Sequence, residues 1–134
     1  AENIFYNAAK LCKDGKILVV SNGKQTDKIT EFISYGRKNK DDVIHYILDL
    51  MGPETDPSKT ARIACAVCPD DDSYGMGIVT TDDIDVCSMK PAYDTMLGLW
   101  VYQGNVEGTL LPPFLEERIT ELQALAISKA KKLE

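Results

Sequence analysis

Apolar residues along the chain recur at helical spacing in some segments and alternate with polar residues in others, and turn residues separate these segments. Helical spacing predicts a helix over residues 3–13 and a second one from about Asp41 to Met51, which Gly52-Pro53 ends. Apolar runs rich in branched residues predict strands at 16–21, 62–68, 74–80, 83–89 and 95–103. A last helix is expected to begin at Pro112-Pro113, because proline suits the first turn of a helix.

The segment 24–35 is compatible with two structures. Asn22-Gly23 follows the strand predicted at 16–21, and this dipeptide tolerates the positive φ angles of a tight hairpin turn, which favours a return strand. Alternatively, Thr26 caps a helix that buries Ile29, Phe32 and Ile33, which lie at helical spacing. We favour the strand because of the turn, and the helix stays open as the alternative.

The element order predicts an α+β fold, in which three or four helices pack on a mainly antiparallel sheet of four to six strands. A chain of 134 residues has the size of one domain, and neither a repeat nor a linker divides it, so we expect a single domain over residues 1–134. The element order resembles that of roadblock and profilin-like domains. This resemblance concerns the order alone and implies no site residues.

Charge is distributed unevenly. The net charge is −6, but residues 1–40 carry eight basic and four acidic side chains, and residues 41–107 carry three basic and thirteen acidic ones. Such polarity can support head-to-tail self-association or the steering of a charged partner. The overall acidity argues against nucleic acid and anionic membranes as partners, and no apolar run is long enough to cross a bilayer. We therefore expect a cytoplasmic protein.

The four cysteines include the pair Cys65 and Cys68 in a C-x-x-C pattern, which is typical of zinc or redox sites. On a strand, positions three apart point to opposite faces, so the two thiols would diverge. We therefore interpret the cysteines as small apolar residues of the core. The alternatives are a zinc site completed by Cys12, Cys87 or His45, a disulfide between Cys68 and Cys87, and a catalytic thiolate. We expect no metal and no cofactor.

Other candidate motifs have structural explanations. The acidic clusters at 70–72 and 82–85 flank one predicted strand, too far apart to share an ion, and match no EF-hand. His45 is the only histidine, and no nucleophile lies near it in the sequence. Gly75-x-Gly77 lies inside a predicted strand and indicates a bulge or a close backbone approach, since a phosphate loop needs a strand-turn-helix context. We predict no catalytic residue.

The segment Met96–Tyr102 is apolar on both faces of its predicted strand. Trp100 and Tyr102 lie on one face together with Met96, and Leu97, Leu99 and Val101 lie on the other. Such a strand is expected in the middle of a sheet, covered on one side by helices and on the other by more helices or a second subunit. We therefore predict a homo-oligomer.

These observations favour a non-enzymatic, self-associating domain that binds a partner protein or a small ligand. The expected ligand-binding residues are Arg62, Tyr74, Trp100 and Tyr102. One alternative is a small enzyme or metabolite-binding protein whose pocket combines Arg62 or Arg37 with Tyr74, Trp100 and Cys65. Another is a small acidic inhibitor or immunity-type protein that covers a basic target.

Overall fold

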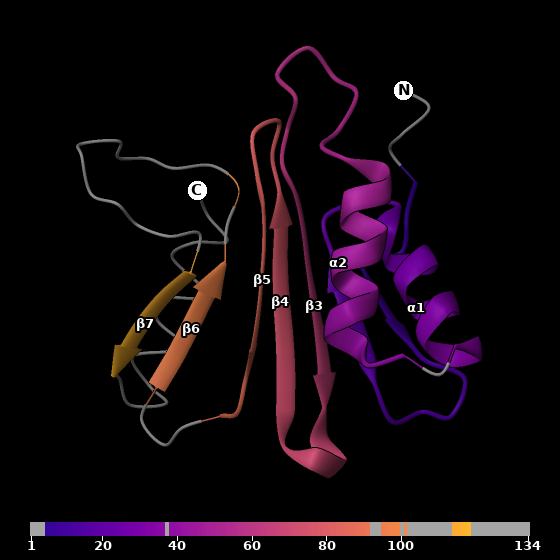
Figure 1. Cartoon of the computed structure of the whole chain (residues 1–134). Helices are drawn as coiled ribbons and strands as arrows, with labels where there is room; N and C mark the ends of the chain where they lie inside the picture. Colours follow the sequence, from indigo (N-terminus) through magenta and orange to yellow (C-terminus); the bar gives the residue numbers. More distant parts are fainter. Residues whose placement is uncertain (1–4, 37, 92–94, 100, 102–113, 119–134) are drawn as a thin grey trace. The chain divides into compact units, whose positions relative to one another are not determined.

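The computed structural model describes residues 5–36, 38–91, 95–99, 101 and 114–118, and the chain divides into two compact units, residues 1–90 and 91–134. The first unit holds a five-stranded antiparallel sheet in the order β1-β2-β3-β4-β5 (Figure 1). The strands are β1 (Ala9–Leu11), β2 (Leu18–Ser21), β3 (Arg62–Cys68), β4 (Ser73–Val79) and β5 (Ile84–Met89). The helices of the described part are α1 (Gln25–Tyr35) and α2 (Lys40–Met51).

The predicted α+β class with an antiparallel sheet is confirmed, but the described part has two helices rather than three or four. Neither helix, at 11 and 12 residues, has the length and apolar character needed to cross a membrane. The single domain over residues 1–134, the homo-oligomer and the cytoplasmic location stay predictions.

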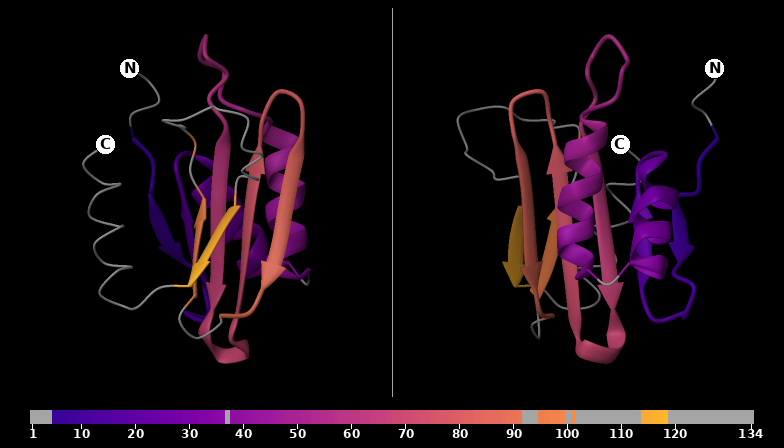
Figure 2. Two further views of the ribbon diagram at one scale, coloured as in Figure 1. Left: turned by 90° about the vertical axis from the view of Figure 1, so that its left-hand side faces the viewer. Right: turned by 45° about the vertical axis from the view of Figure 1, so that its right-hand side comes forward.

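Small residues on the sheet let α2 pack closely against β3 and β4 (Figures 1 and 2). The register places Ala64 opposite Gly77 on the face that α2 covers. A Cβ atom added at Gly77 would lie 2.6 Å from Cγ2 of Ile44 and 2.9 Å from Cδ1 of Leu48. The close backbone approach predicted for Gly75-x-Gly77 is therefore confirmed.

The helix predicted over residues 3–13 is wrong where the structure describes it. Ala9–Leu11 is an edge strand paired with β2, and the turn at Asp14-Gly15, with Gly15 at φ +72°, joins the two strands as a hairpin. The N–H of Cys12 donates to the carbonyl of Ile17 at 2.9 Å in this hairpin. The helical spacing misled because it does not mark a buried face: Leu11 is 59% exposed, although Cys12 is buried.

The strand favoured for 24–35 is also wrong, and the alternative helix is observed. Because α1 begins at Gln25, Thr26 lies inside its first turn rather than at its cap. Ile29 is fully buried as expected, whereas Phe32 is 46% exposed. Asn22-Gly23 thus leads from a strand into a helix. Burial of the inner face of α1 outweighs the local preference of this dipeptide for a hairpin.

The helix predicted from about Asp41 to Met51 is confirmed as α2. The side chain of Asn39 caps it by accepting a hydrogen bond from the N–H of Asp41 at 2.7 Å. Gly52, at φ +65°, ends it in a conformation that favours glycine. The strands predicted at 62–68, 74–80 and 83–89 are confirmed as β3, β4 and β5.

The described part of the second unit consists of two antiparallel strands, β6 (Thr95–Leu99) and β7 (Phe114–Arg118). The strand predicted at 95–103 is observed over Thr95–Leu99 as β6, which belongs to a separate two-stranded sheet and not to the five-stranded one. The helix predicted from Pro112-Pro113 is wrong at Phe114–Arg118. These residues form the strand β7, whose backbone pairs with β6. Trp100, Tyr102 and residues 119–134 of that predicted helix lie outside the described residues.

Candidate functional site

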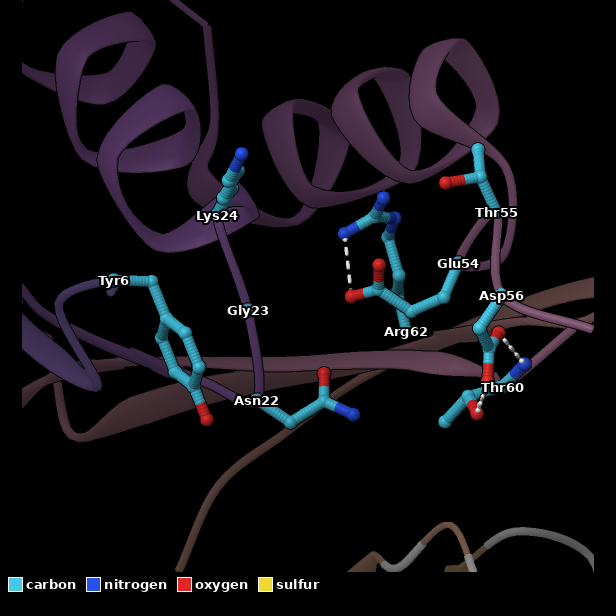
Figure 3. Close-up of a pocket in the computed structure, with 9 residues that line it drawn as sticks. All are labelled: Tyr6, Asn22, Gly23, Lys24, Glu54, Thr55, Asp56, Thr60 and Arg62. Carbon is cyan, nitrogen blue, oxygen red and sulfur yellow. Dashed lines mark hydrogen bonds and ion pairs between the residues drawn. The ribbon is translucent and has the colours of Figure 1, made fainter. Parts of the chain in front are cut away.

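A pocket of about 520 Å³ opens at the edge of the sheet where β2 ends and β3 begins (Figure 3). One wall is the loop 22–24 between β2 and α1, and another is the segment 54–60 between α2 and β3. Its volume falls in the range of small-molecule sites, roughly 300–1,000 Å³. The pocket is lined by Tyr6, Asn22, Gly23, Lys24, Glu54, Thr55, Asp56, Thr60 and Arg62.

Arg62, the first residue of β3, is the buried cation of this pocket. Its Nε donates to the carbonyl of Gly52 at 2.9 Å, and its Nη1 donates to Oε1 of Glu54 at 2.8 Å and to Oε1 of Gln25 at 3.1 Å. The side chain is only 8% exposed. Among the described residues, Nη2 of Arg62 has no hydrogen-bond partner.

Two carboxamide side chains connect the pocket to the sheet. Oδ1 of Asn22 accepts hydrogen bonds from the N–H of Ile63 at 3.0 Å and from Nε2 of Gln25 at 2.7 Å. Nδ2 of Asn22 donates to the carbonyl of Ala61 at 3.1 Å. The Asn22 side chain therefore continues the β2–β3 pairing one step beyond Ser21, where the backbone pairing ends.

Gly23 brings the backbone against the charged cluster. A Cβ atom at this position would lie 2.6 Å from Oε1 of Gln25, 2.9 Å from Oε1 of Glu54 and 3.3 Å from Nη1 of Arg62. A side chain here would displace the groups that hold the guanidinium. Glycine therefore lets the loop approach the cluster without moving the ends of these side chains.

Asp56 shapes the opposite wall. Its carboxylate accepts hydrogen bonds from the N–H of Thr60 at 2.8 Å and from Oγ1 of Thr60 at 2.6 Å (Figure 3). These bonds, the side-chain one first, hold the pKa of Asp56 below its ordinary value. Asp56 therefore closes the loop 56–60 through its two hydrogen bonds to Thr60.

The pocket offers an anionic ligand a favourable end. Lys24 stands at the start of α1, where the helix dipole is positive, and it forms no ion pair with a described acidic side chain. Both acids in the wall are already engaged, Glu54 by Arg62 and Asp56 by Thr60. The ring of Tyr6 stands beside the Asn22–Lys24 loop (Figure 3). The site suits a ligand with an anionic group, an aromatic ring and oxygen acceptors.

Of the ligand-binding residues expected from the sequence, the structure describes Arg62 and Tyr74, and they lie on opposite faces of the sheet. Arg62 lines the pocket, and its role in ligand binding stays a prediction. Cys65 lies three positions along β3 from Arg62, so it points to the opposite face of the sheet. Tyr74 lies on that opposite face too, since it pairs with Val67. One pocket in the first unit therefore cannot combine the three side chains. The other candidates, Trp100, Tyr102 and Arg37, lie outside the described residues.

The sequence interpretation missed the polar residues of the pocket other than Arg62. One available signal was Asn22-Gly23-Lys24, a glycine and a cation directly after a strand, which we interpreted only as a turn. A second was an arginine at the head of an otherwise apolar strand. Gln25 gave no signal, because its partner Arg62 is 37 positions away in the sequence.

The four cysteines of the chain all lie in its described part. All four are free thiols, so the disulfide considered between Cys68 and Cys87 is not formed. Burial, followed by the charges of Cys87 and Asp41, raises the pKa of Cys65 to about 11. Burial also raises the pKa of Cys12. No group of three or more acidic, cysteine or histidine side chains in the described ranges could hold a metal ion.

Comparison with known proteins relates the chain to enzymes. The sequence profile of a family described as IMP cyclohydrolase-like protein matches residues 1–132. A curated protein named IMP cyclohydrolase, from Methanocaldococcus jannaschii, is 42% identical over 83 residues. The aligned region covers 62% of this chain and 38% of that relative, so the chain spans well under half of the relative's length. The prediction of a non-enzymatic binding domain is therefore wrong.

Proposed function

Because this chain belongs to the IMP cyclohydrolase-like protein family, we propose that it supplies the nucleotide site of an enzyme that opens or closes the hypoxanthine ring of IMP. The observation that carries the proposal is the pocket around Arg62, which brings together a buried guanidinium, a lysine that forms no ion pair within the described part of the chain, and a tyrosine ring. IMP carries a phosphate for the lysine, oxygen and nitrogen acceptors for the guanidinium, and an aromatic base for the tyrosine ring.

The proposed reaction adds or removes one water molecule. In ring opening, the water oxygen bonds to the ring carbon between N1 and N3, and the bond from that carbon to N1 breaks. The oxygen stays on the carbon as a formyl group, and the two protons of water end on N1 and N3. In ring closure, the carboxamide nitrogen attacks the formyl carbon and water leaves. Both directions pass through a tetrahedral carbon whose oxygen carries developing negative charge.

The pocket offers a group for each part of such a nucleotide. We assign the phosphate to the Lys24 end, because this cation has no acidic partner among the described residues and lies at the positive end of α1. We assign an oxygen atom of the nucleotide to Nη2 of Arg62, the guanidinium nitrogen that no other described residue engages. The ring of Tyr6 provides an aromatic surface for the base.

The test is an assay of the full chain with IMP and, in the reverse direction, with the ring-opened formamido carboxamide nucleotide. Ring opening destroys the aromatic hypoxanthine, so ultraviolet absorbance follows both directions. Arg62→Met is expected to lower kcat/KM by at least about 100-fold. The matched control is Lys10→Met, which removes an exposed cation outside the pocket and should leave the rate unchanged. Failure of the parent chain both to bind IMP and to interconvert the two nucleotides would contradict the proposal.

A further inference from the structure

Gln25 is a fully buried polar residue in the first turn of α1. Burying a carboxamide is unfavourable unless its polar atoms are hydrogen-bonded. Here each of them has a partner: Oε1 accepts from Nη1 of Arg62, and Nε2 donates to Oδ1 of Asn22 and to the carbonyl of Ile63. A guanidinium can only donate and the other two oxygens accept, so one orientation of the carboxamide satisfies all of them.

This orientation fixes the guanidinium of Arg62 from a third side. Gly52 holds Nε from the end of α2, and Glu54 holds Nη1 from the following segment. Gln25 adds the contact from α1 and is the only fully buried group of the three. Because the guanidinium is planar, these three contacts also determine the direction of the remaining amino group, Nη2.

We propose that Gln25 is a positioning residue of the nucleotide site. It holds Arg62 so that Nη2 is presented to an oxygen of the nucleotide in the pocket. The inference rests on the proposed function for its ligand, but the positioning itself can be measured without any ligand. Gln25 does not contact the substrate in this assignment and acts through Arg62.

The test compares the parent chain with Gln25→Met, which keeps the length of the side chain and removes its polar atoms. IMP affinity is measured by calorimetry, and the arginine Nε–H signals are observed by NMR. Gln25→Met is expected to raise the dissociation constant for IMP at least about tenfold, since a hydrogen bond to a charged group is lost. In the assay KM should rise by the same factor with kcat within about twofold, because the contact serves binding. The Arg62 signal should shift or broaden without ligand.

The matched control is Thr30→Val. Thr30 is a buried polar residue of the same helix whose hydroxyl donates to the carbonyl of Thr26 at 2.7 Å, with no contact to Arg62. It should leave both IMP affinity and the Arg62 signal unchanged. Gln25→Glu keeps an oxygen that can accept from Nη1 of Arg62, so it should lose less IMP affinity than Gln25→Met. If Gln25→Met does not fold, the IMP affinity and Arg62 signal of Gln25→Glu test the positioning role instead.

Three results would overturn the positioning role. The first is an unchanged Arg62 signal in folded Gln25→Met. The second is unchanged IMP affinity in that variant. The third is an equal loss of affinity in Thr30→Val, which would make the effect one of general packing. If the parent chain binds no IMP, the proposed function fails, and the Arg62 signals alone decide whether Gln25 positions the guanidinium.

Discussion

Nη1 of Arg62 lies 2.8 Å from Oε1 of Glu54, in an ion pair whose side chains are 8% and 23% exposed. Another ion pair of this unit, between Lys10 and Asp27, is about half exposed on both sides at 3.4 Å. Breaking a buried pair leaves a charge without compensation, whereas an exposed pair contributes little. The two pairs should therefore differ strongly in what they contribute to stability.

Glu54→Gln is expected to lower the free energy of unfolding by about 2 kcal/mol, because Arg62 stays buried without its ionised partner. Lys10→Met should change it by less than about 0.5 kcal/mol. Urea denaturation followed by circular dichroism measures both. Equal effects of the two variants would show that the pocket pair is solvated like a surface pair.

Gly77→Ala is expected to destabilise the fold by about 2 kcal/mol, because the added methyl group would meet Ile44 and Leu48 of α2. Ser88→Ala, at an exposed position of β5, is the control and should have little effect. Thermal unfolding of both variants gives the comparison. A Gly77→Ala protein as stable as the parent would mean that α2 can move away from the sheet at no cost.

The Cys65 thiol is expected to react slowly. With its pKa raised to about 11, mainly by burial, its thiolate at pH 8 is about 100-fold scarcer than that of an ordinary cysteine. Alkylation by iodoacetamide, followed by mass spectrometry of peptides, measures this rate. The control is the chain in urea, in which all four cysteines should react alike. Rapid labelling of Cys65 in the folded chain would contradict the burial described here.

The same thiol makes stability fall at high pH. Between its ordinary value of 9 and about 11, the unfolded chain loses the Cys65 proton while the folded chain keeps it, so unfolding becomes more favourable as pH rises. Cys65→Ala should show a smaller decrease over this range in urea denaturation. An identical pH dependence for parent and variant would exclude this contribution.

Thr60→Val tests the wall of the pocket. The variant removes the hydroxyl donor and keeps the backbone one, so the pKa of Asp56 should rise toward its ordinary value of 3.8. NMR titration of the carboxyl carbon measures it directly. A carboxyl group whose pKa is lowered by folding stabilises the fold at pH values above its ordinary pKa. The parent should therefore lose this stabilisation as pH falls below 3.8 toward the lower pKa of the folded state, and the variant should lose less.

Elements with a strong periodic pattern could be predicted from the sequence, and those decided by distant contacts could not. The helix at Lys40–Met51 has a capping residue, a buried stripe and a terminal glycine, so local information was sufficient. The segment after Asn22-Gly23 is compatible with both a hairpin and a helix, and its local sequence led us to favour the hairpin. Contact of its inner face with the sheet decides for the helix, and that contact is not local.

The candidate site also combines residues that local sequence could indicate with residues that only distant contacts bring in. Arg62 was predicted to bind a ligand; it lines the pocket, and its role in binding stays a prediction. Its expected companions Tyr74 and Cys65 were grouped with it by type, but the alternation of strand side chains places them on the other face. Gln25 and Glu54 reach Arg62 from different elements, and only the folded backbone brings them together.

The carboxamide of Asn22 takes the place that a further β2 residue would have beside Ile63. The amide proton of Ile63 is therefore held by a pocket residue rather than by a strand. Hydrogen–deuterium exchange of this proton therefore reports on opening of the loop 22–24. Solvent reaches the proton only when the Asn22 side chain separates from the start of β3. Slow exchange there would mean that the cavity is as rigid as the β-ladder to which it is joined.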